Sequence, residues 1–295
     1  MIHTLDLQFL TDHSIAAFVV ESSEGPFLVE CGPHSTWAAL EKGLAGLGYR
    51  PSDIGHVFLS HIHFDHAGAA WALAREGARI YVHPAGYKHL LDPSRLYGSA
   101  KRIYGDLMES LWGEMHPIPA EQLFAIGHGQ SIEVGDKTLT SWHTPGHAVH
   151  HIAWQMGEDV FTGDVGGCRI FGGPAVPPCP PPDIDIEAWV DSIALLRGLE
   201  ARRFWLTHFG EVTDIDAHLD TLEARLWRFA RWMKPYVDAG KDAAAIGPDF
   251  QHFMAQELRE AGASESDVQK YESANPSYMS VAGLMRYWQK KSEIV

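Results

Sequence analysis

The chain has 295 residues, 45% of them apolar, which is enough to bury a core in one large domain or two ordinary ones. Lys and Arg total 23 against 38 Asp and Glu, so the formal charge is −15, and no basic run is present that could follow a phosphate backbone. Composition therefore excludes a disordered chain and argues against nucleic acid as a partner.

The cysteines and the apolar segments indicate where the protein works. Cys31, Cys168 and Cys179 are an odd number without CxxC spacing, which argues against a disulfide framework and predicts a reducing compartment. No window approaches the ~18 apolar residues of a membrane span, and the first residues lack a basic region followed by an unbroken apolar stretch. We expect a cytoplasmic protein with no membrane partner, in which Cys31 packs rather than reacts.

The first half of the chain predicts short strands that give way to helices. Strands are expected in "TLDLQFL", "IAAFVVES", "PFLVECG" and "HVFLS", with a helix from about Thr36 to Gly46. Residues 64–77 have a helical pattern, residues 78–84 read as a strand, and a mostly helical insert follows at about 85–116. Within the insert, Tyr97, Tyr104, Met108 and Trp112 recur at helical spacing.

The second half predicts an antiparallel meander followed by helices. Its strands lie in "SIEVGDKTLTSWHT" and "HHIAWQMGEDVFTGD", before a proline-rich loop and a helix from about Ile186 to Leu199. "RRFWLTHFGEV" is expected to be a final strand that ends in a loop. From Asp216 to the end the pattern is helical, with breaks expected near "IGPD" and "ANPS".

The segment "SHIHFDH" at residues 60–66 is the strongest chemical signal. Alternate residues of an extended chain share a face, so His61 and His63 point one way, whereas Asp65 and His66 point elsewhere as the chain turns into a helix. One metal could take the first pair and a second metal the last pair. Because a four-coordinate catalytic ion needs about three protein ligands and a water, further ligands must come from distant segments.

Three isolated residues meet that requirement, each just after a strand-like run: His147 in "HTPGH", Asp164 in "FTGD" and His208 in "WLTHFG". The histidines near His147 are ambiguous, and we expect them to support ligands or pack rather than bind metal: His143, His150 and His151. The remaining candidates are expected to have no metal role: His83, His89, His116, His128 and His218.

This constellation resembles the metallo-β-lactamase-fold hydrolase superfamily, whose mark is an HxHxDH motif with distal His, Asp and His. The match runs from about residue 5 to 212, and its spacing is similar to glyoxalase II-like and quorum-quenching-lactonase-like members. The resemblance implies that His61, His63 and His147 bind a first metal, that Asp65, His66 and His208 bind a second, and that Asp164 bridges both. It also implies an αββα sandwich with the metals at one edge.

One position departs from the family pattern. Where the family usually has an aspartate in a "DTG"-like segment, this chain has Glu30 in "VECGP". If Glu30 takes that place behind the ligands, its longer side chain must still reach a ligand histidine or a loop amide.

The predicted fold class is α/β (α+β), a four-layer αββα metallo-β-lactamase sandwich with a helical insert and a helical C-terminal extension. We expect residues 1–215 to form the catalytic domain and residues 216–295 an extension packed on it. The alternatives are that the extension caps the substrate pocket or forms a homodimer contact.

The predicted function is a dinuclear metal-dependent hydrolase that uses a metal-bridging hydroxide on a small ester, thioester or lactone. Asp164 would hold the two ions and Asp65 would pass a proton to the leaving group. Ser60 lacks a "GxSxG" context, so covalent catalysis is not expected. The alternatives are a mononuclear iron persulfide dioxygenase-like enzyme, a small phosphodiesterase, and a metal-bound module without catalysis.

The sequence also leads to expectations about the metals and about the walls of the substrate pocket. A shell of nitrogen and oxygen ligands suits zinc, iron and manganese, and we expect two divalent ions with zinc first. The walls of a pocket for a small-molecule substrate are expected from the insert and from the loop after Asp164: Tyr97, Tyr104, Met108, Trp112 and Phe171. The alternative for the aromatic residues is core packing within the insert.

Overall fold

The computed structural model describes residues 1–293, so the helix predicted to the chain end is untested for Ile294 and Val295, which lie outside the described residues. The strands are β1 (Ile2–Asp6), β2 (Ala16–Val20), β3 (Phe27–Val29), β4 (His56–Phe58), β5 (Arg79–Val82), β6 (Leu123–Ala125), β7 (Ser131–Val134), β8 (Lys137–His143), β9 (Ile152–Met156), β10 (Asp159–Phe161), β11 (Arg203–Leu206) and β12 (Gly210–Val212). The α-helices are α1 (Trp37–Gly46), α2 (Phe64–Ala67), α3 (Ala70–Arg75), α4 (Pro84–Leu91), α5 (Ser94–Tyr104), α6 (Met108–Trp112), α7 (Ile186–Arg197), α8 (Ile215–Asp238), α9 (Ala243–Glu260), α10 (Glu265–Ala274) and α11 (Ser277–Glu293).

The strands form two mixed sheets of six, in the orders β1-β2-β3-β4-β5-β6 and β12-β11-β10-β9-β8-β7. Aromatic side chains from both sheets meet in one buried cluster, in which the rings of Phe58 and Trp154 lie 5.0 Å apart and those of Phe18 and Trp205 lie 5.8 Å apart. The two sheets therefore face each other across an aromatic layer.

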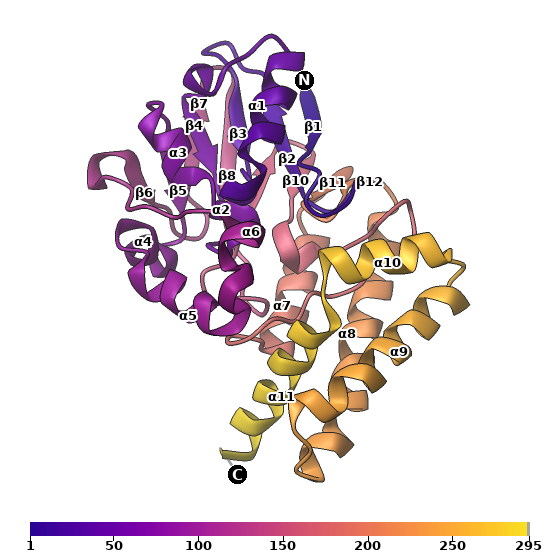
Figure 1. Cartoon of the computed structure of the whole chain (residues 1–295). Coiled ribbons are helices and arrows are strands. Elements are labelled where there is room, and N and C mark those ends of the chain that lie inside the picture. Colours follow the sequence, from indigo (N-terminus) through magenta and orange to yellow (C-terminus); the bar gives the residue numbers. More distant parts are fainter. Residues whose placement is uncertain (294–295) are drawn as a thin grey trace.

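Helices cover the outer face of each sheet (Figure 1). Strand β2 shows how one strand serves two layers, because Phe18 points to the layer between the sheets whereas Ala17 and Val19 point to the cluster under α1 and α3. A second outer cluster joins strands β9 to β12 to α7, α8, α9 and α11. The αββα sandwich predicted from the sequence is confirmed.

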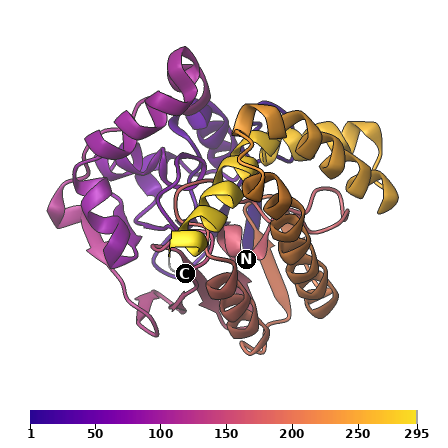
Figure 2. The ribbon, with the colours of Figure 1, turned by 90° about the horizontal axis from the view of Figure 1, so that it is seen from below.

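The C-terminal helices and the insert approach each other near α11. Figure 2 shows α11, in yellow, between the magenta insert and the orange helices. The indole N–H of Trp288 on α11 donates to the carbonyl of Ala230 on α8, at 2.7 Å. Residues beyond 215 thus share their core with the second sheet, while the division at residue 215 stays a prediction.

Several predicted elements differ in the structure. The helix expected over residues 64–77 is two helices, α2 and α3, and the strand expected to end in a loop near His208 continues as a hairpin through β12. The break expected near "IGPD" is wrong, because α9 runs through Pro248 and the chain breaks instead at Gly240, whose φ is 66°. Asp242 begins α9 by accepting a hydrogen bond from the Ala245 amide at 2.8 Å.

The cysteines and helices agree with the compositional expectations. Cys31, Cys168 and Cys179 are all free and buried. Burial raises the pKa of the Cys31 thiol well above its usual value, and the Glu30 carboxylate adds to the shift, so this thiol is a poor nucleophile. Among residues 1–293, no helix combines the length and apolar character needed to cross a membrane.

Candidate metal centre

The seven predicted ligands converge at the edge where both sheets end. His61 and His63 follow β4, and Asp65 and His66 lie in the short helix α2. The other three come from the second sheet and its loops: His147 between β8 and β9, Asp164 in the 3-10 turn Gly163–Gly166 after β10, and His208 between β11 and β12. Segments more than 140 residues apart in sequence are thereby brought to one point.

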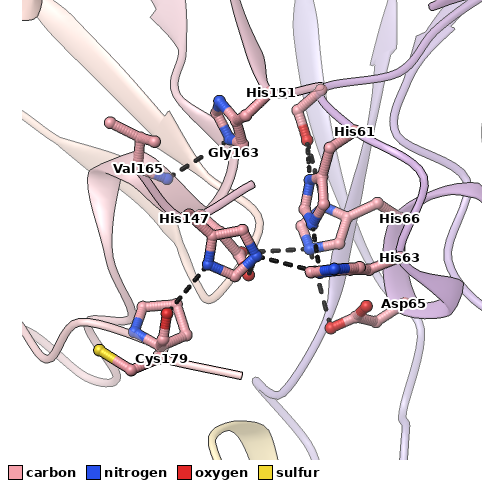
Figure 3. Close-up of polar contacts among 12 residues, drawn as sticks. His61, His63, Asp65, His66, His147, His151, Gly163, Val165 and Cys179 are labelled. Atoms are coloured by element: carbon pink, nitrogen blue, oxygen red, sulfur yellow. Dashed lines mark hydrogen bonds and ion pairs between the residues drawn. The ribbon is translucent and has the colours of Figure 1, made fainter. Parts of the chain in front are cut away.

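The first ligand set consists of His61, His63, His147 and Asp164. His61 Nε2 lies 2.8 Å and His147 Nε2 lies 3.0 Å from His63 Nδ1, and Asp164 Oδ2 lies 3.3 Å from His147 Nε2. Figure 3 shows His61, His63 and His147 directed toward one another. Three imidazoles and one carboxylate thus face a common centre.

The second set consists of Asp65, His66, Asp164 and His208. Asp164 Oδ1 lies 3.1 Å from His66 Nε2 and 3.3 Å from His208 Nε2, while Asp65 Oδ2 lies 3.7 Å and 3.5 Å from the same two nitrogens. Asp164 belongs to both sets and uses a different oxygen in each.

The donor atoms fit divalent metal ions. Within each set the ligand atoms lie within 4.8 Å of one another, and all are imidazole nitrogens or carboxylate oxygens. His66 Nε2 and Asp164 Oδ1 are fully buried and have no hydrogen-bond partner among the described residues. Since an unpaired buried polar atom costs about 1–3 kcal/mol, a bound cation would satisfy both. The cluster supports divalent metal binding.

The outward-facing nitrogens of the ligand histidines fix the orientation of their rings. His147 Nδ1 lies 2.9 Å from the carbonyl of Pro178, and His208 Nδ1 lies 2.6 Å from the carbonyl of Ser14. Because a carbonyl can only accept, each Nδ1 carries the proton, and the Nε2 lone pair is directed to the cluster.

Glu30 lies directly behind His66. Its Oε2 accepts from His66 Nδ1 at 2.7 Å, and its Oε1 accepts from the amide of Ser60 at 2.7 Å. The longer side chain therefore reaches both groups named in the sequence analysis, a ligand histidine and a loop amide. The backbone of Glu30 has a positive φ of 63°, which directs the side chain into this position.

Electrostatics differ between the two sets. Burial lowers the pKa of His63 to about 3, with His147 adding to the shift, and burial likewise holds the pKa of His61 well below its usual value. Burial also lowers the pKa of His147. These three imidazoles are neutral near pH 7 and offer free lone pairs.

The second set behaves as a network of opposite charges. Burial disfavours the charged form of His66, but Asp164, Glu30 and Asp65 outweigh it and raise the pKa of His66 well above its usual value. Burial would raise the pKa of Asp164, but the imidazoles of His66, His147 and His208 outweigh it and hold that pKa far below its usual value. Without metal, protons on the second set balance its carboxylates.

The histidines near His147 lie around the ligands rather than among them. His151 Nε2 accepts from the amide of Val165 at 3.4 Å (Figure 3). Its Nδ1 lies 2.8 Å from Thr144 Oγ1. His143 stacks on His83 at 4.3 Å, and His150 is buried beside His63. None of the three belongs to either ligand set of the described residues.

Sequence reasoning missed one support of the Asp164 turn. His218, on α8, has its Nε2 2.7 Å from the carbonyl of Gly166 and therefore donates to it. A histidine on the first turns of a long amphipathic helix gives no local signal of this contact, because the partner lies 52 positions away.

A cavity of about 480 Å³ opens over the centre, with His63, Asp65, Asp164 and His208 at its floor. Its walls come from residues 9–15, from α5 and α6, from the proline-rich loop and from the junction of α10 and α11. Of the residues predicted to wall the pocket, Tyr104 and Trp112 line this cavity.

The other three predicted pocket residues lie elsewhere. Tyr97 and Met108 pack in the cluster behind the wall, where Met108 is buried. Phe171 is 53% exposed and stands outside the cavity lining, against His13 and Lys270. The aromatic stripe is thus divided between the cavity wall and the core of the insert.

A model of the metallo-beta-lactamase superfamily matches residues 10–208. The chain belongs to this superfamily. Its relatives include the metallo-beta-lactamase fold-containing protein ST1585 of Sulfurisphaera tokodaii, 26% identical over 209 residues that cover 68% of this chain and 79% of that protein. An atrochrysone carboxyl ACP thioesterase of Aspergillus fumigatus is 26% identical over 207 residues, which cover 69% of this chain but 39% of the thioesterase.

Among solved structures, the metallo-beta-lactamase family protein TTHA1429 of Thermus thermophilus superposes with a TM-score of 0.72 at 20% identity. The match covers 99% of this chain and 94% of that one, so the likeness in fold includes the C-terminal helices.

Proposed function

We propose that this chain is a dinuclear metal-dependent hydrolase of a small ester, thioester or lactone, with zinc as the first expected metal and iron or manganese as alternatives. The observation that carries the proposal is that two ligand sets share Asp164 at the floor of a cavity. Two divalent ions bound there would lower the pKa of a water between them toward ~7 and polarise a carbonyl oxygen.

The side chains around the ions have distinct tasks in this proposal. Burial would raise the pKa of Asp65, but the imidazoles of His66 and His208 outweigh it and lower that pKa to about 2. Asp65 is therefore a carboxylate near neutral pH, and it borders the cavity. Because its pKa is so low it can hold a proton only transiently, so in this proposal Asp65 passes the proton of the attacking water on to the leaving group. Asp164 belongs to both ligand sets and would bind both ions.

The superfamily supports a hydrolase. Its members are mostly hydrolases, and a thioesterase is among the relatives. Because this chain spans about two fifths of that thioesterase, the reaction of the whole relative is not transferred, and only the ester and thioester chemistry enters the proposal. The narrower likeness to glyoxalase II-like or lactonase-like members stays a prediction, as do the small-molecule partner, a homodimer and a cytoplasmic location.

The alternatives are separated by what they require. A phosphodiesterase would have to bind its phosphate through the metal ions alone, because among the described residues lining the cavity none is Lys or Arg. An iron-dependent persulfide dioxygenase would bind a single iron and consume oxygen. A binding module without catalysis would keep its metals but turn over no substrate.

The deciding experiment combines metal analysis with a substrate panel. Purified protein is loaded with zinc, manganese or iron, its metal content is measured, and turnover is assayed on an ester, a thioester and a lactone. We expect two metals per chain and hydrolysis of at least one class. Asp164→Asn should lose about one metal and nearly all activity, whereas Asp220→Asn, which alters an exposed carboxylate paired with Arg197, should change neither. One iron per chain with oxygen uptake on glutathione persulfide would overturn the proposal, as would full loading without turnover.

A further inference from the structure

We propose that the substrate carries an apolar chain without a charge at its far end, and that the insert and the C-terminal helices select this chain by length. This inference rests on the proposed function, because it assigns the substrate class of the same site. It concerns the part of the cavity beyond the metal centre.

Two walls of the cavity come from segments outside the ligand-bearing loops. The insert contributes α5 and α6, and the opposite wall is the α10–α11 junction. Most of these lining side chains are apolar: Leu96, Ala100, Ile103, Leu111, Trp112 and Met279. Tyr104 on the insert and Met279 on α11 meet, with the phenol oxygen 3.9 Å from the sulfur. A cavity of about 480 Å³ between such walls suits a flexible apolar group.

The rim of the cavity continues the apolar surface. Leu10, Ile103 and Tyr278 border the cavity and are 65%, 50% and 50% exposed. Large apolar side chains at such exposure from three separate segments leave an apolar approach to the metal centre. A chain that enters or protrudes here stays in contact with apolar atoms.

No charged group of the walls is free to bind a charged tail. Among the described lining residues none is Lys or Arg, and the one carboxylate apart from Asp65 and Asp164 is Glu272. Both oxygens of Glu272 are engaged by Ser277, one accepting from its amide at 3.0 Å and the other from its hydroxyl at 2.6 Å. A charge at the far end of the substrate would lose its water without gaining a partner, which is costly.

The walls are held in place before a ligand binds. The pair of Glu272 and Ser277 fixes the turn between α10 and α11. On α10, Lys270 pairs with Asp12 of the N-terminal loop at 2.7 Å and lies 4.3 Å from the ring of Phe171. Because these contacts hold α10 in place, the wall does not move outward to accept longer chains, and the length of chain that fits is limited.

The first test is a series of p-nitrophenyl esters with straight acyl chains from acetyl to hexadecanoyl, assayed on the zinc-loaded full chain. Each buried methylene should raise kcat/KM by about fourfold until the cavity is filled, after which the increase should stop. Esters of the same length that end in a carboxylate should be at least about tenfold poorer. Equal rates for all lengths, or for neutral and carboxylate-ended chains, would overturn the inference.

The second test shifts the length limit with matched variants. Met279→Ala removes a lining side chain, so the chain length at which kcat/KM stops rising should increase, whereas in Ala100→Leu it should decrease. Met285→Ala is the control, since Met285 lies on the same helix, is also half-buried and does not line the cavity. Metal content should stay unchanged in all three variants, and acetyl ester turnover should stay unchanged in Met285→Ala. A limiting chain length that does not move in Met279→Ala and Ala100→Leu, with metal content intact, would refute the role of these walls.

A binding measurement separates this inference from the proposed function. Straight-chain methyl ketones are not hydrolysed, and their affinity for the metal-loaded protein can be followed by calorimetry. Affinity that rises about fourfold per methylene and changes in Met279→Ala would support the apolar chain site even if no ester were turned over. Ester hydrolysis without any such trend would leave the hydrolase standing and overturn the chain site alone.

Discussion

Substitution of Glu30 by Gln tests the support behind the second ligand set. Glu30 is 1% exposed and accepts two hydrogen bonds, from His66 Nδ1 and from the Ser60 amide, both at 2.7 Å. A glutamine has nearly the same shape but offers one acceptor oxygen and one donor nitrogen. It can satisfy only one of the two donors and must place its own N–H groups against the other.

The expected loss follows from that mismatch. A buried donor left unpaired costs about 1–3 kcal/mol, and removal of a carboxylate partner from a ligand histidine costs about 10- to 100-fold in metal affinity. We expect Glu30→Gln to weaken the site of His66 by this factor and to leave the site of His61, His63 and His147 nearly unchanged. Glu30→Asp keeps two acceptors on a shorter arm and should lose less.

The assay is chelator competition on the loaded protein, which resolves a tighter and a weaker ion. Glu21→Gln is the control, because Glu21 also pairs with a histidine, His3 at 2.8 Å, but on the surface. If Glu30→Gln retained both ions with wild-type affinity, the assignment of Glu30 as the residue that orients His66 would be wrong.

Three further predictions concern stability and metal loading. Burial lowers the pKa of His218 from 6.5 to about 4, so between these pH values the unfolded chain binds a proton that the folded chain does not, and the free energy of unfolding falls by up to about 3 kcal/mol as the pH falls through this window. In urea unfolding, the free energy of unfolding of His218→Gln should therefore depend less on pH in this window. An unchanged pH dependence would contradict the role of His218. Gly163 has a φ of 51°, and a Cβ there would lie 2.6 Å from His151 Nε2, so Gly163→Ala should lower both Tm and metal content. Gly157→Ala is the control, because Gly157 has a φ of 60° but open space around it, and this variant should lower Tm less and keep the metal. Equal losses of Tm and metal in the two variants would exclude the contact with His151 as the cause. The carboxylates of Asp164, Glu30 and Asp65 raise the pKa of His66, so metal loading near pH 7 should release protons. The release can be measured by calorimetry in buffers of different ionisation enthalpy. Heats of binding that do not depend on the buffer would argue against this charge network.

The convergence of the seven candidate ligands could be predicted from the sequence because metal binding constrains residue type and position together. His147, Asp164 and His208 each stand just after a strand, and strand ends meet at one edge of a layered fold. Glu30 could be singled out because it stands where the superfamily usually has an aspartate in a "DTG"-like segment. The alternation of His61 and His63 and the turn into α2 separate the motif into two pairs, whereas the assignment of His147, Asp164 and His208 to the two sets comes from the resemblance to the superfamily.

The cavity wall within the insert was harder to predict because helical phase does not persist through a break. The stripe from Tyr97 to Trp112 assumes one continuous helix, but α5 ends at Tyr104 and Gly105 has a φ of 55°. The helices on either side have different directions, so equal spacing no longer means one face. Met108 consequently packs inward, whereas Trp112 lines the cavity.

The apolar C-terminal segments indicate that they could cap the pocket, but no local pattern predicts the short series of contacts by which they reach the metal centre. His147 donates to the carbonyl of Pro178, and the next residue, Cys179, places its amide 3.4 Å from Ser280 Oγ and its carbonyl against Gly283 of α11. A Cβ at Gly283 would lie 2.0 Å from that carbonyl, so only glycine lets the proline-rich loop approach the helix this closely. The loop that orients a metal ligand is therefore itself positioned by α11, which also lines the cavity. Since α11 supports the loop at Gly283 and borders the pocket at Met279, a larger residue at Gly283 would alter ligand geometry and substrate fit together.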